Sequence, residues 1–249
     1  MGKVVEAKKL SFKYDKLPIL EDVNLSIYNG DFMGIVGPNG SAKSTLVKLL
    51  LGILKPQQGE VYLMGKSIDK FKEWHKIGYI SQRVRNFNNS FPATVEEIIA
   101  ANLYHEMGFL KFIRKKHMEK IEEVLRFVDM VDYKDRLIGT LSGGQQQRIF
   151  IARTLISNPE IIFMDEPLVG VDIDSQERFF SLMEKLNKNL GITLIMVSHD
   201  LGVIREHTNR VACIGEQRVF VHSSKDFNEE DYIKSVYGGK ATLLHHRHL

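Results

Sequence analysis

The stretch Gly37-Pro38-Asn39-Gly40-Ser41-Ala42-Lys43-Ser44-Thr45 directly follows the apolar run 32–36. This order predicts a buried strand, a tight glycine-containing loop, and a helix that begins at Lys43. Backbone N–H groups of such a loop and of the helix N-terminus converge on phosphate oxygens. Lys43 is expected to reach the β- and γ-phosphate oxygens, and Ser44 to offer its hydroxyl to Mg²⁺. The stretch as a whole therefore predicts a binding site for a nucleoside triphosphate.

One position departs from the pattern Gly-x-x-x-x-Gly-Lys-Ser/Thr, because Ala42 stands where the second glycine belongs. An alanine adds a Cβ beside the phosphates and disfavours a positive φ. It is tolerated if the residue has helical dihedral angles, and otherwise it weakens the site. A Gly-Lys-Ser loop can also arise by chance, so the interpretation depends on further motifs that follow in order.

Composition and length exclude several classes of protein. The 249 residues are enough for one large domain or for a domain with a subdomain. Lys and Arg number 34 against 31 Asp and Glu, and a net charge of +3 does not suggest a nucleic-acid binder. The single cysteine, Cys213, cannot form an internal disulfide, which fits a reducing cytosol. No signal-peptide core and no stretch near ~18 apolar residues is present, so any membrane role is expected to run through a partner.

Alternation of apolar residues predicts an α/β fold with a helical insertion. Strands are expected at 4–14, 19–28, 31–36, 59–64, 76–81, 161–164, 193–197, 210–214 and 218–221. Helices are expected at 43–54, at 95–104 behind a capping box of Thr94 and Glu97, at 114–131, after Ser142, and at 174–190. The predicted domain consists of a core of about 1–82 and 141–222, a helical subdomain of about 83–140 and a tail of about 223–249.

The apolar run Ile161–Met164 ends in two carboxylates, Asp165 and Glu166. A buried parallel strand delivers such residues at its C-terminal end, where the phosphate loop also lies. Asp165 is then expected to hold Mg²⁺, directly or through water, and Glu166 to polarise the attacking water as general base. The alternative is a strand that ends in a solvated acidic turn.

The sequence Leu141-Ser142-Gly143-Gly144-Gln145 is the most specific signal in the chain. Ser142 opens a helix, and the two glycines let a ligand approach the backbone, which gives a second helix N-terminus suited to an anion. A structural alternative is that Ser142 and Gln145 form only a capping box. Two adjacent glycines in a first helical turn are nevertheless unfavourable without a further reason.

These motifs together resemble the nucleotide-binding subunit of an ABC transporter, from about Lys3 to Phe220. The resemblance implies a P-loop NTPase fold of the ABC type with an antiparallel β subdomain and a helical insertion. It also implies ATP and Mg²⁺ as ligands and a head-to-tail homodimer that encloses two ATP molecules. In that arrangement Ser142, Gly143, Gly144 and Gln145 of one subunit contact the ATP bound by the other.

Four more residues acquire roles from the same resemblance. Gln82 matches the Q-loop glutamine that senses Mg²⁺ and the γ-phosphate, and His199 matches the switch histidine that contacts the γ-phosphate. Asp172 matches the D-loop aspartate, and Tyr14 matches the aromatic residue that stacks on adenine. Each alone would usually be a surface, packing or hydrogen-bonded structural residue. Leu168 in place of threonine and the D-loop sequence Val-Gly-Val-Asp depart from the family pattern.

The segment 90–97, Ser-Phe-Pro-Ala-Thr-Val-Glu-Glu, resembles the zinc and manganese uptake branch of these ATPases, as does Ala42 in the phosphate loop. The resemblance implies import of a divalent metal, zinc ahead of manganese, at the cytoplasmic face of the membrane. The implied partners are permease subunits, which dock near 82–95, and an extracytoplasmic metal-binding protein, with no nucleic acid. The alternative is that the segment docks a permease for another cargo.

Other classes stay open as alternatives. A soluble ABC-type switch in DNA repair or translation usually carries long coiled-coil arms or two fused cassettes, whereas this chain has one cassette. A kinase needs an acceptor site and has no use for Leu-Ser-Gly-Gly-Gln. The histidine-rich tail 245–248 is a solvated end or a metal sensor. The basic segment 111–117 is a solvated helix start or lies near anionic lipid.

Overall fold

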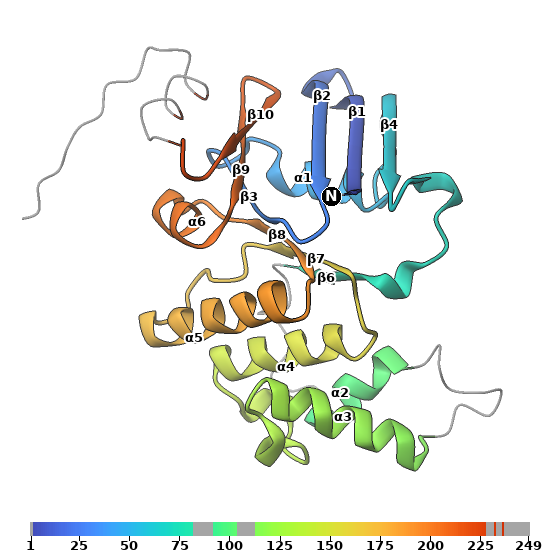
Figure 1. The fold of residues 1–249 in the computed structure, drawn as a ribbon, viewed down its shortest axis with the longest axis vertical. Coiled ribbons are helices and arrows are strands. Elements are labelled where there is room, and N and C mark those ends of the chain that lie inside the picture. The colour runs from blue at the N-terminus through green and yellow to red at the C-terminus, as the bar shows by residue number, and fades with distance from the viewer. Residues whose placement is uncertain (1, 82–91, 104–112, 228–231, 233–235, 237–249) are drawn as a thin grey trace, which may run out of the picture. The chain divides into compact units, whose positions relative to one another are not determined.

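The computed structural model describes residues 2–81, 92–103, 113–227, 232 and 236. The chain divides into two compact units, which we call unit 1 and unit 2 (Figure 1). Unit 1 joins residues 1–71 to residues 197–249, and unit 2 is the intervening segment 72–196. The phosphate loop therefore belongs to unit 1, and the signature sequence at 142–145 belongs to unit 2.

Unit 1 contains an antiparallel sheet in the order β2 (Leu17–Tyr28), β1 (Lys3–Tyr14), β4 (Gln58–Leu63) and β5 (Lys66–Ser67). The first three of these strands run side by side in Figure 1. Alternate residues of β1 are buried, which is the pattern of a sheet with one apolar face. This sheet is the expected antiparallel subdomain, and only the two-residue β5 is absent from the sequence prediction.

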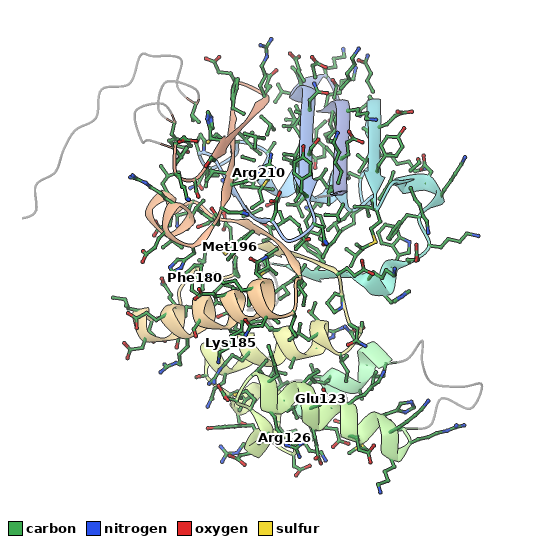
Figure 2. The ribbon with its side chains drawn as sticks, in the orientation of Figure 1. Glu123, Arg126, Phe180, Lys185, Met196 and Arg210 are labelled. Atoms are coloured by element: carbon green, nitrogen blue, oxygen red, sulfur yellow. The ribbon has the colours of Figure 1, made fainter. Side chains whose placement is uncertain are left out.

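A second group of strands in unit 1 leads into the phosphate loop. The wholly buried β3 (Phe32–Val36) pairs in parallel with β9 (Arg210–Gly215), and β9 pairs antiparallel with β10 (Arg218–Ser223). Arg210, labelled in Figure 2, donates from Nη1 to the Asp31 carboxylate and to the Ser26 carbonyl, both at 2.8 Å. Because Asp31 is buried, this ion pair fixes the turn that precedes β3.

Two helices of unit 1 flank this group. The helix α1 (Lys43–Leu50) is shorter than the predicted 43–54, because the chain turns at Gly52 with a φ of 66°. The helix α6 (Leu201–His207) was not expected, although Asp200 marks its start by accepting a hydrogen bond from the Val203 N–H at 3.1 Å. A Cβ on Gly34 would lie 2.3 Å from Ile204 Cγ2, so this glycine allows α6 to pack closely on β3.

Unit 2 contains the strands β8 (Thr193–Val197), β7 (Ile161–Asp165) and β6 (Ile77–Ile80), in that order. The pair β6 and β7 is parallel, with Ile80 opposite Met164. Every residue of β7 and β8 is buried, as expected for central strands that read as continuous apolar runs. The strand β7 therefore delivers Asp165 at its C-terminal end, as the sequence predicts.

The helices of unit 2 are α2 (Val95–Ala100), α3 (Lys115–Phe127), α4 (Gly143–Leu155) and α5 (Ile173–Glu184), and α5 continues as a π-helical turn, η7 (Lys185–Asn189). The predicted capping box of α2 is confirmed, since the Glu97 N–H donates to Thr94 Oγ1 and the Thr94 N–H donates to the Glu97 carboxylate. The helix α3 ends before the predicted residue 131, because Asp129 adopts a φ of 56°.

Short 3₁₀ turns complete the two units. They are η1 (Ile68–Lys70), η2 (Trp74–Lys76), η4 (Ala101–Leu103), η5 (Val131–Tyr133) and η6 (Ile138–Thr140). The predicted division of the chain into core, helical subdomain and tail stays a prediction.

Candidate functional site

The Lys43 ammonium group is held by backbone carbonyl groups of the phosphate loop. The Lys43 side chain is 6% exposed, and its Nζ donates to the carbonyl oxygens of Gly37 and Pro38, both at 2.9 Å. The helix α1 starts at Lys43, so the backbone N–H groups of its first turn, which includes Ser44 and Thr45, point out of the N-terminal end of the helix. A positive charge and several amide donors therefore share one loop, as an anion site requires.

Two glycines shape the loop, Gly37 by close packing and Gly40 by its backbone conformation. A Cβ on Gly37 would lie 2.4 Å from Ser41 Oγ and 2.7 Å from the Ile214 carbonyl oxygen, while Gly40 has a φ of 81°. Ser41 Oγ is buried and has no hydrogen-bond partner among the described residues. Because a buried hydroxyl without a partner is unfavourable, it provides a donor that a phosphate oxygen would satisfy. These residues fit a triphosphate.

Ala42 does not have the helical dihedral angles that would make an alanine unstrained here. It is the N-cap of α1 with φ 73° and ψ 19°, in the left-handed region, and its side chain makes no capping hydrogen bond. Such a conformation is unfavourable by about 1–2 kcal/mol for a residue with a Cβ. The condition under which an alanine would be tolerated here is therefore not met, and the alanine strains the loop.

Unit 1 also contains His199 and Tyr14. The Ser198 N–H donates to the Ile35 carbonyl at 3.1 Å, which places the segment before His199 beside β3, the strand that enters the loop. His199 is exposed. The Tyr14 ring is 47% exposed and contacts Phe12 edge to face at a centroid distance of 4.8 Å. Both side chains are accessible to a ligand, and their roles stay predictions.

The two predicted acidic residues lie at the end of β7 in unit 2. Asp165 is 5% exposed. Burial raises the pKa of Tyr79 on the neighbouring strand β6, and the negative charge of Asp165 raises it further. Glu166 follows with a φ of 48°, a left-handed conformation that is unusual for a residue of its size. Backbone strain of this kind is more common at functional sites than inside regular helices or strands.

The signature sequence forms the N-terminus of α4. The Gln145 N–H donates to Ser142 Oγ at 3.3 Å, and the Ser142 N–H donates to Gln145 Oε1 at 2.9 Å. The capping box that the sequence allowed is therefore present. It does not explain the two glycines between these residues, so the structural alternative accounts for only part of the motif.

The structure explains the two glycines, Gly143 and Gly144, differently. A Cβ on Gly144 would lie 2.9 Å from Ser175 Oγ and 3.2 Å from Ser175 Cβ, so close packing between α4 and the start of α5 favours that glycine. A Cβ on Gly143 would meet no atom within 4 Å. A glycine in a helix is unfavourable by up to about 1 kcal/mol relative to alanine, and nothing in the described chain requires one at Gly143.

Asp172 is the N-cap of α5. Its Oδ1 accepts a hydrogen bond from the Ser175 N–H at 2.9 Å. The Ser175 hydroxyl first, and then the Ser175 N–H, lower the pKa of this carboxyl below its usual value. Val169 and Ile173, on either side of Asp172, are 40% and 76% exposed. The D-loop therefore presents apolar side chains to its surroundings beside a fixed carboxylate.

Two buried glutamines that sequence reasoning missed hold the loops around these motifs. Gln146 Nε2 donates to the carbonyls of Ile138 and Leu141, at 3.1 and 3.2 Å. Gln147 Nε2 donates to the Pro167 carbonyl at 2.9 Å. The signal available in the sequence was a pair of long amides at helix positions that face a core.

The predicted Mg²⁺ ligands are distributed over the chain. Ser44 offers a hydroxyl in unit 1 and Asp165 a carboxylate in unit 2, and oxygen donors of this kind suit Mg²⁺. The third, Gln82, lies outside the described residues, as do 86–91, 111–112 and the tail 245–248. Within the part of the chain that the structure describes, no group of three His, Cys, Asp or Glu side chains is arranged to hold a metal ion.

Known proteins are similar to this chain over most of its length. Residues 20–169 match the family described as ABC transporter. The chain is 44% identical over 91% of its length to the zinc uptake system ATP-binding protein ZurA of Listeria monocytogenes, of which it covers 88%. It is 34% identical over 96% of its length to the manganese transport system ATP-binding protein MntB of Bacillus subtilis, of which it covers 94%.

A solved structure supports the same conclusion for the fold. The dimeric, post-hydrolysis state of an ATP-binding cassette bound to ADP and Pi matches with a TM-score of 0.75 and 29% identity, over 90% of this chain and 100% of that one. The predicted fold class is therefore confirmed. Within the described ranges, no helix is both long and apolar enough to cross a membrane.

Proposed function

The chain belongs to the ABC transporter family, and we propose that its ATP hydrolysis powers the import of a divalent metal ion, zinc ahead of manganese, through a separate membrane permease. As a member of this family the chain is an ATPase. The observation that carries the cargo is its 44% identity to a zinc uptake ATP-binding protein. The similarity to a manganese transport protein, at 34% identity, favours manganese as the second candidate.

The residues of unit 1 bind the nucleotide in this proposal. Lys43 exchanges its two carbonyl partners for phosphate oxygens, and Ser41 Oγ gains a partner that the described residues do not provide. The amides of the first turn of α1 complete the phosphate site, with Asn39 and Gly40 in the loop before it. Tyr14 stacks on adenine, and His199 contacts the γ-phosphate.

Residues from both units contribute to the chemistry in this proposal. Glu166 accepts a proton from the water that attacks the γ-phosphorus, and His199 and Lys43 stabilise the charge on the phosphate oxygens. Mg²⁺ held by Ser44 and Asp165, together with Gln82, would neutralise charge on the β- and γ-oxygens. The buried position of Asp165 suits a carboxylate whose charge is offset by a cation when ATP is present.

A second copy of the chain completes each ATP site in this proposal. A Cβ on Gly143 would meet no atom of the described residues within 4 Å, and its place at the N-terminus of α4 leaves room for a phosphate from another subunit. The exposed Val169 and Ile173 beside Asp172 supply apolar surface that a dimer would bury. Closure on ATP and reopening after hydrolysis would then drive the permease.

The permease has a fitting docking surface in unit 2. A cavity of about 490 Å³ lies between β6, η4 and α4, with Trp74, Tyr79, Asn102 and Arg153 among its lining residues. Arg153 Nε donates to Asn102 Oδ1 at 3.1 Å, and burial lowers the pKa of the guanidinium. Because Arg153 forms no ion pair among the described residues, we propose that a carboxylate of the permease pairs with it. An extracytoplasmic metal-binding protein would deliver the ion to that permease.

The cargo is tested by uptake of radioactive zinc and manganese in cells from which the gene has been deleted. We expect zinc uptake to fall and to return with the wild-type gene, but not with a gene that carries Lys43→Ala. Loss of manganese uptake alone would identify manganese, and not zinc, as the cargo. Unchanged uptake of both ions would contradict metal import.

A further inference from the structure

The side chain of Gln147 links the signature helix to the segment that carries the proposed general base. Gln147 is 8% exposed, and its Nε2 donates to the Pro167 carbonyl at 2.9 Å in a buried hydrogen bond. Both partners lie in unit 2. A buried amide donor that loses its acceptor is unfavourable, so the distance between α4 and Pro167 is well defined.

The hydrogen bond restrains the peptide between Pro167 and Leu168, the second peptide after Glu166. The Glu166 backbone has a left-handed φ of 48°, which is unfavourable for a residue with a long side chain. Pro167 has its own φ fixed by its ring. With the Pro167 carbonyl held by Gln147, the strained Glu166 has little freedom to relax toward a commoner conformation. The hydrogen bond from α4 to Pro167 is therefore one of the contacts that restrain the Glu166 backbone.

The same helix begins with the signature sequence. α4 extends from Gly143 to Leu155, and Gln147 lies two residues beyond the sequence Ser142 to Gln145. Because Gly143 and Gln147 are only four residues apart on one helix, they move together as a rigid body. Whatever shifts the first turn of α4 therefore also shifts the amide that holds Pro167.

We infer that Gln147 is a positioning residue that couples the two ATP sites of the proposed dimer. ATP held by one subunit engages the first turn of α4 in the other subunit. Through Gln147 and Pro167, that engagement aligns Glu166 with the ATP that the second subunit itself holds. The inference rests on the proposed function, because the first turn of α4 has a ligand only when two copies come together. It assigns cooperativity between the sites to a single buried hydrogen bond.

The test replaces the amide by a side chain of similar length without a donor, Gln147→Met. We expect kcat for ATP hydrolysis to fall about tenfold or more, because misplacing a catalytic group by a fraction of an ångström slows proton transfer. We expect the Hill coefficient to fall from a wild-type value above one to about one. The ATP concentration that half-saturates binding should change less than about twofold, because Gln147 contacts no nucleotide in this account.

A matched control separates positioning from stability. Gln146 has the same exposure of 8% and also donates to backbone carbonyls, but these precede the signature sequence. Gln146→Met should lower the melting temperature as much as Gln147→Met does, while kcat falls less than about threefold and cooperativity is kept. An equal loss of kcat and of cooperativity in both variants would overturn the inference.

A second variant tests the hydrogen bond itself and also serves if Gln147→Met does not fold. In Gln147→Glu, burial raises the carboxyl pKa, and only the protonated form can donate to the Pro167 carbonyl. We expect its kcat relative to wild type to rise as the pH falls from about 8 to about 6. A ratio that does not change with pH would contradict the inference.

Failure of this inference can be distinguished from failure of the proposed function. If wild-type protein hydrolyses ATP cooperatively and Gln147→Met matches it in kcat and Hill coefficient, only the coupling through Gln147 fails. If the wild-type chain shows no ATP-dependent dimer at all, the proposed function fails first.

Discussion

The N-termini of α1 and α4 both resemble anion sites, yet they are built differently. At α1 the N-cap, Ala42, provides no side-chain hydrogen bond, and the buried Lys43 brings a positive charge into the loop. At α4 Ser142 and Gln145 satisfy each other's backbone N–H groups, and the first turn carries no charged side chain. We therefore expect the first terminus to bind phosphate alone, and the second to contribute only in the proposed dimer, when ATP is held by the other subunit.

Removing the charge at α1 should give the largest effect. Lys43→Ala removes a charged donor that is expected to meet two phosphate oxygens, so ATP affinity should fall on the order of 100-fold. Fluorescent ATP analogues give the affinity directly. If Lys43→Ala binds ATP as wild type does, α1 is not the primary phosphate site and the contrast between the two termini disappears.

A change at α4 should affect assembly and leave the monomer intact. Gly143→Ala fills space that is open in the described chain, so the free energy of unfolding should rise by about 0.5 kcal/mol. ATP hydrolysis should nevertheless fall about tenfold or more, because the added methyl group obstructs the second subunit's phosphate. Chemical denaturation and steady-state hydrolysis measure the two quantities on the same protein.

The neighbouring glycine is the matched control for this change. Gly144→Ala would place a Cβ 2.9 Å from Ser175 Oγ, so this variant should lose stability as well as activity. A Gly143→Ala variant with full activity would show that the bare N-terminus of α4 meets no ligand.

Strain at the N-cap of α1 gives a smaller effect. Ala42→Gly relieves the left-handed conformation, so the free energy of unfolding should rise by about 0.5–1 kcal/mol after allowing for the flexibility of glycine. ATP affinity should rise slightly, because the loop no longer resists the conformation that binds. Ala152→Gly in the interior of α4 should instead lower stability. An Ala42→Gly variant with a lower free energy of unfolding than wild type would contradict the conclusion that Ala42 is strained.

The smallest effect concerns the cap of α5. Hydrogen bonds from the Ser175 hydroxyl and N–H lower the pKa of the Asp172 carboxyl below the ordinary value of 3.8. A lowered pKa in the folded state stabilises the protein at pH values above 3.8, and this contribution is lost as pH falls through the lower folded value. The stability difference between wild type and Asp172→Ala should therefore shrink below that pH in denaturation curves. A difference that grows on acidification would contradict the assignment.

Sequence reasoning found the local features whose cause is local. Apolar runs located the buried strands β3, β7 and β8, and the pair Thr94 and Glu97 located the start of α2. It missed α6, because seven residues give little periodicity, although Asp200 was a usable cap signal. It could not foresee that Gly144 is fixed by Ser175 or that Gln147 reaches Pro167, since both depend on contacts between segments distant in the sequence.

The same limit applies to the site. The motifs placed Lys43 at a helix start and Asp165 at a strand end, where the structure has them. The left-handed conformations of Ala42 and Glu166 were not predictable from residue type, because both residues disfavour that region. Only the surrounding structure can impose such conformations.

The most direct test of the account is the mass of Glu166→Gln in solution, measured by sedimentation with and without ATP. Without its general base the protein should bind ATP without splitting it, and it should become a dimer that holds two ATP molecules. A Glu166→Gln variant that stays monomeric at saturating ATP, or that hydrolyses ATP at the wild-type rate, would contradict the claim that two copies of this chain share each nucleotide.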